Sequence, residues 1–311
     1  MERQATRYIN PLQDFGFKKL FVTESNMDLL ISFLNEVFKG RKTIVDVVFT
    51  KNEHPGDIHS EAGAIFDVLC KGDKGEHFLI EVQRAKQDNF VNRAMFYIAR
   101  DISSQRPRGS DLKWKYKFSE VYLISIIGNF TLDNKVRGQY ITEFCLCDWY
   151  NGKIFHDEFG LVFIELPNFT KTQAQLKTRL DKWLDLLKNL GEMQAVPEGF
   201  QESVFKKLFS EASYSNLSKE EKMDHDRRQK YIWDNENCAE YALNESLEKG
   251  LQLGKKQGLQ LGKKQGLQLG EKKGRAEREH ETALALQRLN LPLEMISAAT
   301  HLSIEEIESL N

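Results

Sequence analysis

Residues 61–83 contain two apolar runs joined by a short polar connection, and this stretch constrains the fold more than any other. It reads EAGAIFDVLC, then KGDKG, then EHFLIEVQ. Two such runs around a Gly-containing connection are typical of a β-hairpin with a longer loop. With a loop over 72–76 centred on Lys74, antiparallel pairing places Asp67 of the first run opposite Glu81 of the second.

A carboxylate inside an apolar strand is costly unless another group compensates its charge, and a metal ion is the usual compensation. Because side chains alternate along a strand, Glu81 and Gln83 share one face while Val82 points to the other. Facing carboxylates repel each other across a ladder, so the pairing of Asp67 with Glu81 favours a divalent cation between them.

The order of Asp67, a hairpin and Glu81-x-Gln83 resembles the PD-(D/E)XK nuclease superfamily, and more narrowly its branch of recombination-promoting nucleases and transposases (Rpn). The Asp/Glu-x-Lys core alone is a weak motif, whereas four matching stretches in the same order are specific. The resemblance covers residues 8–190, and its other stretches are DFGFKKLF at 14–21, YIARDISSQ at 97–105 and FIELPNF at 163–169.

The resemblance implies a restriction-endonuclease-like α/β fold, in which helices flank a mixed β-sheet. It also implies that Asp67 and Glu81 hold Mg²⁺ (or Mn²⁺), with the main-chain carbonyl of Val82 as a further ligand. Gln83 departs from the superfamily pattern, which has Lys here, although the Rpn branch carries Gln. A neutral amide can orient a water or a phosphate oxygen, but it cannot supply positive charge.

The segment 88–105 is expected to form a helix after the hairpin. Arg93, Tyr97 and Arg100 fall on one face of it, where they would hold a DNA backbone beside the metal site or form a solvated surface. Lys86 is a second candidate DNA contact and a source of the missing positive charge, with a solvated lysine as the alternative.

The first two helices, within residues 11–38, offer Asp14 and Glu36 as a further acid for the site. Strands are expected at 43–50, 121–130, 140–149 and 161–167, and an amphipathic helix at 171–190. These elements predict a mixed sheet with helices packed against its faces.

A tandem repeat, GLQLGKKQ, occupies residues 250–274 and returns a glycine every four residues. A straight helix has 3.6 residues per turn, so its leucines do not hold one face. Seven glycines also make an isolated helix poor. Three interpretations are open: the repeat packs closely against a second helix, it forms a basic arm that binds phosphates, or it is a spacer whose lysines are solvated.

Four parts are therefore expected: a nuclease domain (1–190), a helical extension (191–246), the basic repeat (247–280) and a small helical unit (281–311). In the last part, Ser303 and Glu306 form a capping box. DNA phosphates would repel the acidic side chains of its third helix, so sequence-specific DNA binding is not expected. A unit that packs or self-associates fits better.

The composition is that of a globular chain. Its formal net charge of −2 does not indicate nucleic-acid binding. No run of residues is apolar enough to span a bilayer and no signal-peptide pattern is present. The four cysteines lack zinc spacing, so a reducing, cytoplasmic setting is expected.

The function expected from these features is metal-dependent hydrolysis of DNA phosphodiester bonds, linked to recombination or transposition. DNA and a second copy of the chain, bound through the repeat, are the expected partners. The alternatives are a self-assembling interaction protein on a degenerate nuclease fold and a protein that binds DNA without cleaving it.

Overall fold

The computed structural model describes residues 7–50, 53–54, 64–65, 67–106, 115–132 and 138–310. The chain forms two compact units, Met1–Arg228 and Gln229–Asn311, which are described separately. In the described part of the chain, no helix is both long enough and apolar enough to cross a membrane.

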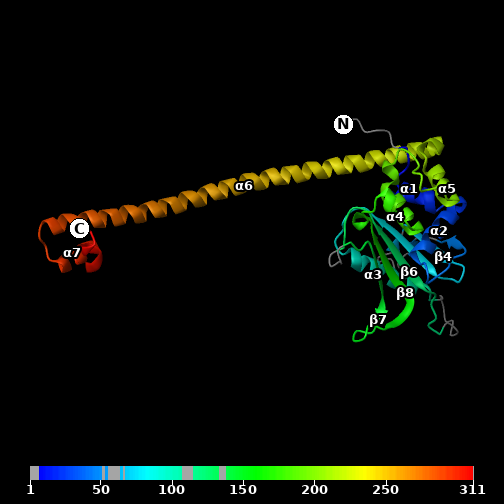
Figure 1. Ribbon diagram of the computed structural model, residues 1–311, viewed down its shortest axis with the longest axis horizontal. Coiled ribbons are helices and arrows are strands. Elements are labelled where there is room, and N and C mark those ends of the chain that lie inside the picture. The colour runs from blue at the N-terminus through cyan, green and yellow to red at the C-terminus, as the bar shows by residue number, and fades with distance from the viewer. Residues whose placement is uncertain are drawn as a thin grey trace. The chain divides into compact units, whose positions relative to one another are not determined.

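Six strands form the main sheet of the first unit: β1 (Val47–Phe49), β4 (Val68–Gly72), β5 (His77–Gln83), β6 (Val121–Ile127), β7 (Ile141–Cys147) and β8 (Ile154–Glu165). Their order across the sheet is β1-β4-β5-β6-β8-β7 (Figure 1). β5, β6 and β8 are parallel to one another, and the other neighbouring pairs are antiparallel. A separate pair joins β2 (Glu53–His54) to β3 (Ala64–Ile65).

Helices cover both faces of this sheet. α3 (Phe90–Ser104) packs on the face that carries Leu79 of β5. The opposite face, which carries Phe78 and Ile80, packs in one core with α1 (Asp14–Phe21), α2 (Met27–Val37), α4 (Arg179–Asn189) and α5 (Ser203–Ala212). The alternation of β5 therefore decides which of its side chains face α3. The expected restriction-endonuclease-like fold, a mixed sheet flanked by helices, is confirmed.

The core of the first unit includes residues that follow 190. Phe200 and Phe205 are fully buried there, and Leu217 is nearly so. Trp183 of α4 contacts Phe205 edge to face with ring centroids 5.3 Å apart. Residues 200–217 thus share the core that supports the sheet.

Three expected boundaries were wrong. The strand expected at 161–167 begins at Ile154, because the β7–β8 ladder continues through an exposed hairpin. His156, Asp157 and Glu158 interrupt its apolar pattern there. The helix expected at 171–190 begins at Arg179, where Thr178 and Asp181 form a capping box. The strand expected at 43–50 is only three residues long.

The second unit contains most of α6 (Lys219–Arg288), which includes the whole repeat, and two short helices. α7 (Leu293–Thr300) and α8 (Ile304–Glu308) pack with the end of α6 around Ala283, Ile296 and Ile307. The expected capping box of Ser303 and Glu306 is present at the start of α8. Each glycine of the repeat faces open space.

Candidate active site

The two strands of the hairpin place Asp67 and Glu81 opposite each other. Val68 pairs with Ile80 and Cys70 with Phe78, so the next position of this register joins Asp67 to Glu81. The expected register is therefore confirmed. The expected strand around Asp67 is not, because Asp67 is a bend that precedes β4 by one residue.

Asp67 is held at the strand end by a main-chain contact. Its Oδ2 accepts a hydrogen bond from the backbone N–H of Val82 at 2.6 Å. Burial raises the pKa of the Asp67 carboxyl; the Val82 N–H opposes that rise and the negative charge of Asp14 adds to it. Asp67 is thus a desolvated acid on a fixed backbone.

Glu81 is the more strongly perturbed acid. Burial raises its pKa to about 7, and the charge of Asp67 adds to the rise, while Arg93 opposes it. A pKa near neutrality is typical of a carboxyl group that binds a cation or transfers a proton.

Arg93 of α3 connects Glu81 to Gln83. Its Nη2 lies 3.0 Å from Oε1 of Glu81 and donates to Oε1 of Gln83 at 2.6 Å. Its Nη1 donates to Gln87, and the Nε2 of Gln83 donates to the carbonyl of Ala85 at 2.7 Å. The Gln83 amide is therefore oriented by contacts at both of its ends.

Tyr97 lies one helical turn after Arg93 and belongs to the same cluster. The Arg93 guanidinium is 5.8 Å from the centre of the Tyr97 ring. Burial raises the pKa of the Tyr97 hydroxyl, and the charge of Glu81 adds to the rise. Arg100 is half-buried further along α3, and Lys86 is exposed in the loop before it.

A small cavity of about 40 Å³ opens beside Asp67, large enough for a water molecule. It is lined by Leu12, Asp14, Phe17, Lys18, Asp67 and Val82. Asp14 forms ion pairs with Lys18 at 2.6 Å and with Arg228 at 2.5 Å. The candidate acid Asp14 thus adjoins Asp67.

Glu36, the other candidate acid, has different surroundings. Its carboxylate lies 3.3 Å from Nζ of Lys39 and 3.9 Å from Nη1 of Arg179 on α4. It does not line the cavity beside Asp67.

The oxygen atoms at this site suit a hard divalent cation. Asp67, Glu81 and the Val82 carbonyl are the oxygen donors that Mg²⁺ prefers, with water as the remainder. Within the described ranges, no cluster of three or more His, Cys, Asp and Glu side chains is arranged to hold a metal. An ion held here would therefore have two carboxylate ligands, and carbonyl and water oxygens would complete its coordination.

α3 is anchored to β5 at a second point. At the start of β5, Nδ1 of His77 lies 2.7 Å from Oδ2 of the fully buried Asp101. Gln105 Nε2 donates to the same Asp101 oxygen at 3.2 Å. Because α3 runs antiparallel to β5, Asp101 fixes one end of the helix and Arg93 the other.

The sequence alone proposed Asp67, Glu81 and Gln83 as site residues but did not predict the contacts of Arg93 with the last two. It also missed Lys18, whose charge opposes the burial-driven rise in the pKa of Asp67. The buried Glu165 was missed as well; its Oε2 accepts a hydrogen bond from the backbone N–H of Leu132 at 3.2 Å. Lys18 and Glu165 lie in DFGFKKLF and FIELPNF, two of the stretches on which the family resemblance rests. These stretches therefore contained the sequence signal that could have identified both residues.

Residues 11–242 match the family described as PD-(D/E)XK nuclease family transposase. No curated protein and no solved structure matches the chain. The matched segment includes the sheet, α3, the paired carboxylates and the start of α6, and it ends before the glycine repeat. The chain belongs to the PD-(D/E)XK nuclease family transposases.

Proposed function

We propose that this protein is a Mg²⁺-dependent endonuclease that hydrolyses DNA phosphodiester bonds at the site formed by Asp67, Glu81, Gln83 and Arg93. The observation that carries the proposal is the pairing of Asp67 with Glu81 at the end of two strands, with Arg93 bridging Glu81 and Gln83. The family supports a nuclease-like function.

The carboxylates of Asp67 and Glu81 and the carbonyl of Val82 would hold Mg²⁺ or Mn²⁺. When bound, the cation supplies positive charge to the scissile phosphate and promotes deprotonation of a water nucleophile. Burial makes Glu81 reluctant to ionise, with a pKa of about 7, and binding of a cation would favour its charged form. Asp14 is the more suitable third acid, because it lines the cavity beside Asp67 and Glu36 does not.

Arg93 would supply the positive charge that Gln83 cannot. In PD-(D/E)XK nucleases this charge comes from the Lys of the motif, at the position of Gln83 here. The Arg93 guanidinium donates to the Gln83 amide oxygen at 2.6 Å, so its charge lies next to that position. A guanidinium presents several N–H donors in one plane and suits a phosphate oxygen. Gln83 would then orient the water or phosphate beside it.

The DNA backbone would extend from this site along α3 past Tyr97 and Arg100, with Lys86 at its edge. Arg100 is half-buried and Lys86 exposed. Such contacts position a duplex without reading its sequence. A cleavage activity of this kind would serve recombination or transposition.

Two further properties belong to the proposal. The chain would self-associate through the repeat at 250–274, whose leucines are exposed. It would act in the cytoplasm, since Cys145, Cys147 and Cys238 are exposed free thiols that suit a reducing compartment.

Plasmid nicking by the purified protein tests the proposal. Supercoiled DNA should be nicked with Mg²⁺ or Mn²⁺, and both chelation and Asp67→Asn should abolish nicking. Glu36→Gln is the matched acid control and should nick normally. A wild-type protein that binds DNA but never nicks it would favour the non-catalytic alternative, in which Arg93 neutralises Glu81 permanently.

A further inference from the structure

The segment 229–278 of α6 exposes an unusual amount of apolar surface for a single helix. Its exposed large apolar side chains are Tyr231, Trp233, Tyr241, Leu243, Leu247, Leu251, Leu253, Leu259, Leu261, Leu267 and Leu269. Soluble monomers rarely expose so many large apolar side chains along one helix. Seven glycines, each costing about 1 kcal/mol relative to alanine, also leave the helix without intrinsic stability. The helix therefore requires a partner surface.

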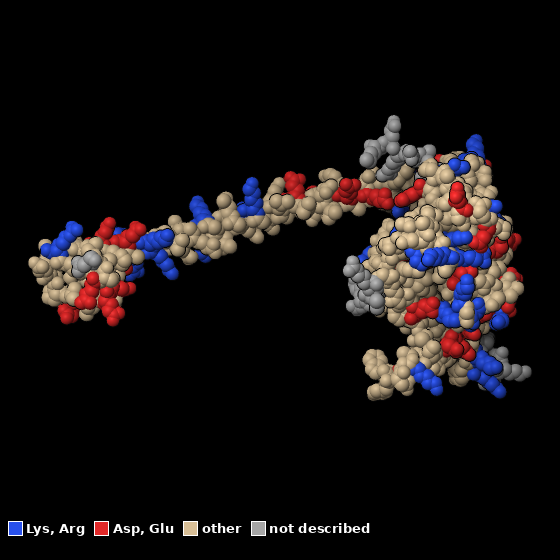
Figure 2. All heavy atoms as spheres, in the orientation of Figure 1, with Lys and Arg blue, Asp and Glu red and all other residues tan. Residues whose placement is uncertain are grey.

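Charge is segregated along the same segment. Residues 229–248 carry five acids and one lysine, whereas residues 249–278 carry nine basic residues and two acids. Figure 2 shows acidic side chains along one stretch of the helix and basic side chains along the next. In the described part of the chain, Lys255, Lys256, Lys263 and Lys264 form no ion pair.

From this segregation we infer that two copies of the chain pair through residues 229–278 in antiparallel orientation. The acidic half of each copy (residues 229–248) then lies against the basic half of the other (residues 249–278). A parallel pair would set like charges side by side along the whole contact. The inference rests on the self-association proposed above, and it adds the orientation.

The repeat also predicts the hand of the pair. Leucines flank the glycine row on both sides, as in Leu253-Gly254 and Gly258-Leu259, while Gln and Lys occupy the remaining row. Residues four apart in the sequence are separated by slightly more than one helical turn of 3.6 residues. The apolar stripe therefore shifts around the helix axis from one repeat to the next. Apolar periods above 3.6 residues give right-handed supercoils, so the pair is expected to wind in the right-handed sense.

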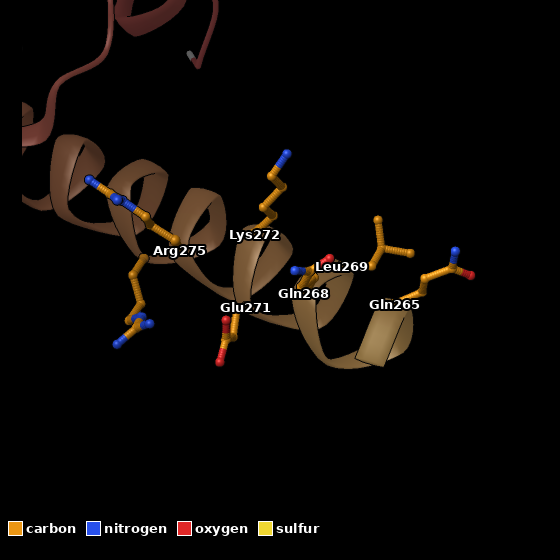
Figure 3. A pocket seen from close by; sticks show the side chains of 7 residues that line it. Gln265, Gln268, Leu269, Glu271, Lys272 and Arg275 are labelled. Atoms are coloured by element: carbon orange, nitrogen blue, oxygen red, sulfur yellow. The ribbon is translucent and has the colours of Figure 1, made fainter. Parts of the chain in front are cut away.

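The surface of the helix is compatible with such a partner. Gln265, Gln268, Leu269 and Lys272 border an open stretch of the α6 surface together with Glu271, Arg275 and Arg278. Figure 3 shows Lys272 and Glu271 leaving the helix in opposite directions. Side chains therefore surround this part of α6, and a second helix can pack against it. DNA phosphates would pair with the lysines, but DNA would leave the leucines and the acidic half exposed.

Charge reversal tests the orientation in the full-length protein. Asp234→Lys, Glu240→Lys and Glu245→Lys together change the net charge of the acidic half from −4 to +2. Five Lys→Glu changes, at Lys255, Lys256, Lys263, Lys264 and Lys272, change that of the basic half from +7 to −3. Each variant should weaken dimerisation by about tenfold or more in sedimentation equilibrium, because like charges then face each other. Their combination, or a mixture of the two variants, should restore the dimer.

A triple reversal in α8 and α7, Glu294→Lys with Glu305→Lys and Glu308→Lys, is the matched control and should leave dimerisation unchanged. Cys238 gives a second readout in a Cys145→Ser/Cys147→Ser background. In the antiparallel pair, the two Cys238 residues lie about 36 Å apart along the axis if the centre is near Gly250. Oxidation should therefore form no Cys238–Cys238 disulfide.

A Cys238–Cys238 disulfide, or an acidic-half reversal that leaves the dimer unchanged or tighter, overturns the antiparallel orientation alone. A wild-type chain that stays monomeric at high concentration overturns self-association as well. If such a monomer loses DNA affinity on reversal of the basic half, that half binds phosphates instead.

Discussion

Arg93 and Gln83 form the contact that distinguishes this site: Nη2 of Arg93 donates to Oε1 of Gln83 at 2.6 Å, and the same nitrogen lies 3.0 Å from Glu81. The motif has Gln83 where the superfamily pattern has Lys, and the Arg93 guanidinium lies beside that residue. The positive charge thus comes from helix α3 and not from strand β5. The proposed metal site and its counter-charge thus depend on how α3 packs on β5.

The pH dependence of stability should report the burial of Glu81. Its folded pKa of about 7 lies above its ordinary value of 4.5, so the folded protein favours the protonated acid. Stability from this group is fully present below pH 4.5 and is lost as the pH rises through 7, a loss of about 3 kcal/mol.

Urea unfolding in chelator from pH 4 to pH 8 measures this loss. Glu81→Gln should flatten the profile, and Glu158→Gln on the exposed hairpin should not. Equal slopes in wild type and Glu81→Gln would show that Glu81 is not buried as an acid. In Mg²⁺ the wild-type profile should flatten as well, because the cation favours the charged carboxylate.

Asp67→Asn should separate stability from catalysis. The Asn side chain keeps an acceptor for the Val82 N–H, and it removes a negative charge that raises the pKa of Glu81. The metal-free variant should be at least as stable as wild type at pH 8 in urea unfolding, yet inactive in nicking.

Asp67→Ala is the matched comparison. It removes the acceptor for the Val82 N–H and should be less stable than Asp67→Asn by about 1 kcal/mol. If Asp67→Asn itself were strongly destabilised, charge repulsion would not be the dominant feature of this pair.

The second anchor of α3 can be tested without touching the site. His77→Ala removes a hydrogen-bonding partner of the fully buried Asp101, and we expect a loss of about 3 kcal/mol in the free energy of unfolding. His156→Ala, at a more exposed contact with Glu158, should cost less than about 1 kcal/mol. Similar losses for both variants would contradict a fixing role for Asp101.

Truncation after Ser246 should leave the first unit folded and active on short DNA. The described core of that unit ends at Leu217, and the candidate site residues all precede residue 101. Light scattering should show a smaller assembly. If the repeat binds phosphates instead, truncation should reduce the salt dependence of DNA affinity by about 0.9 log units for each phosphate that the repeat neutralises. Loss of folding would contradict this division of the chain.

The sequence predicted the sheet and the hairpin register because both depend on local patterns. The loop centred on Lys74 sets Asp67 against Glu81, and the apolar run at 121–130 marks the central strand β6. The early start of β8 was missed because Ile154 and Phe155 lie in an exposed ribbon. The link from Arg93 to Gln83 is a tertiary contact between a helix and a strand, which periodicity does not reveal.

Moving the positive charge tests the central role of Arg93 most directly. Arg93→Gln should lower the nicking rate by about 10²–10³ while Mg²⁺ still binds by calorimetry, because one positioned charge is removed. Gln83→Lys in the Arg93→Gln background places a cation on the strand, as in the superfamily pattern, and should recover activity to within about tenfold of wild type. An Arg93→Gln variant that nicks at the wild-type rate would contradict the role assigned to Arg93.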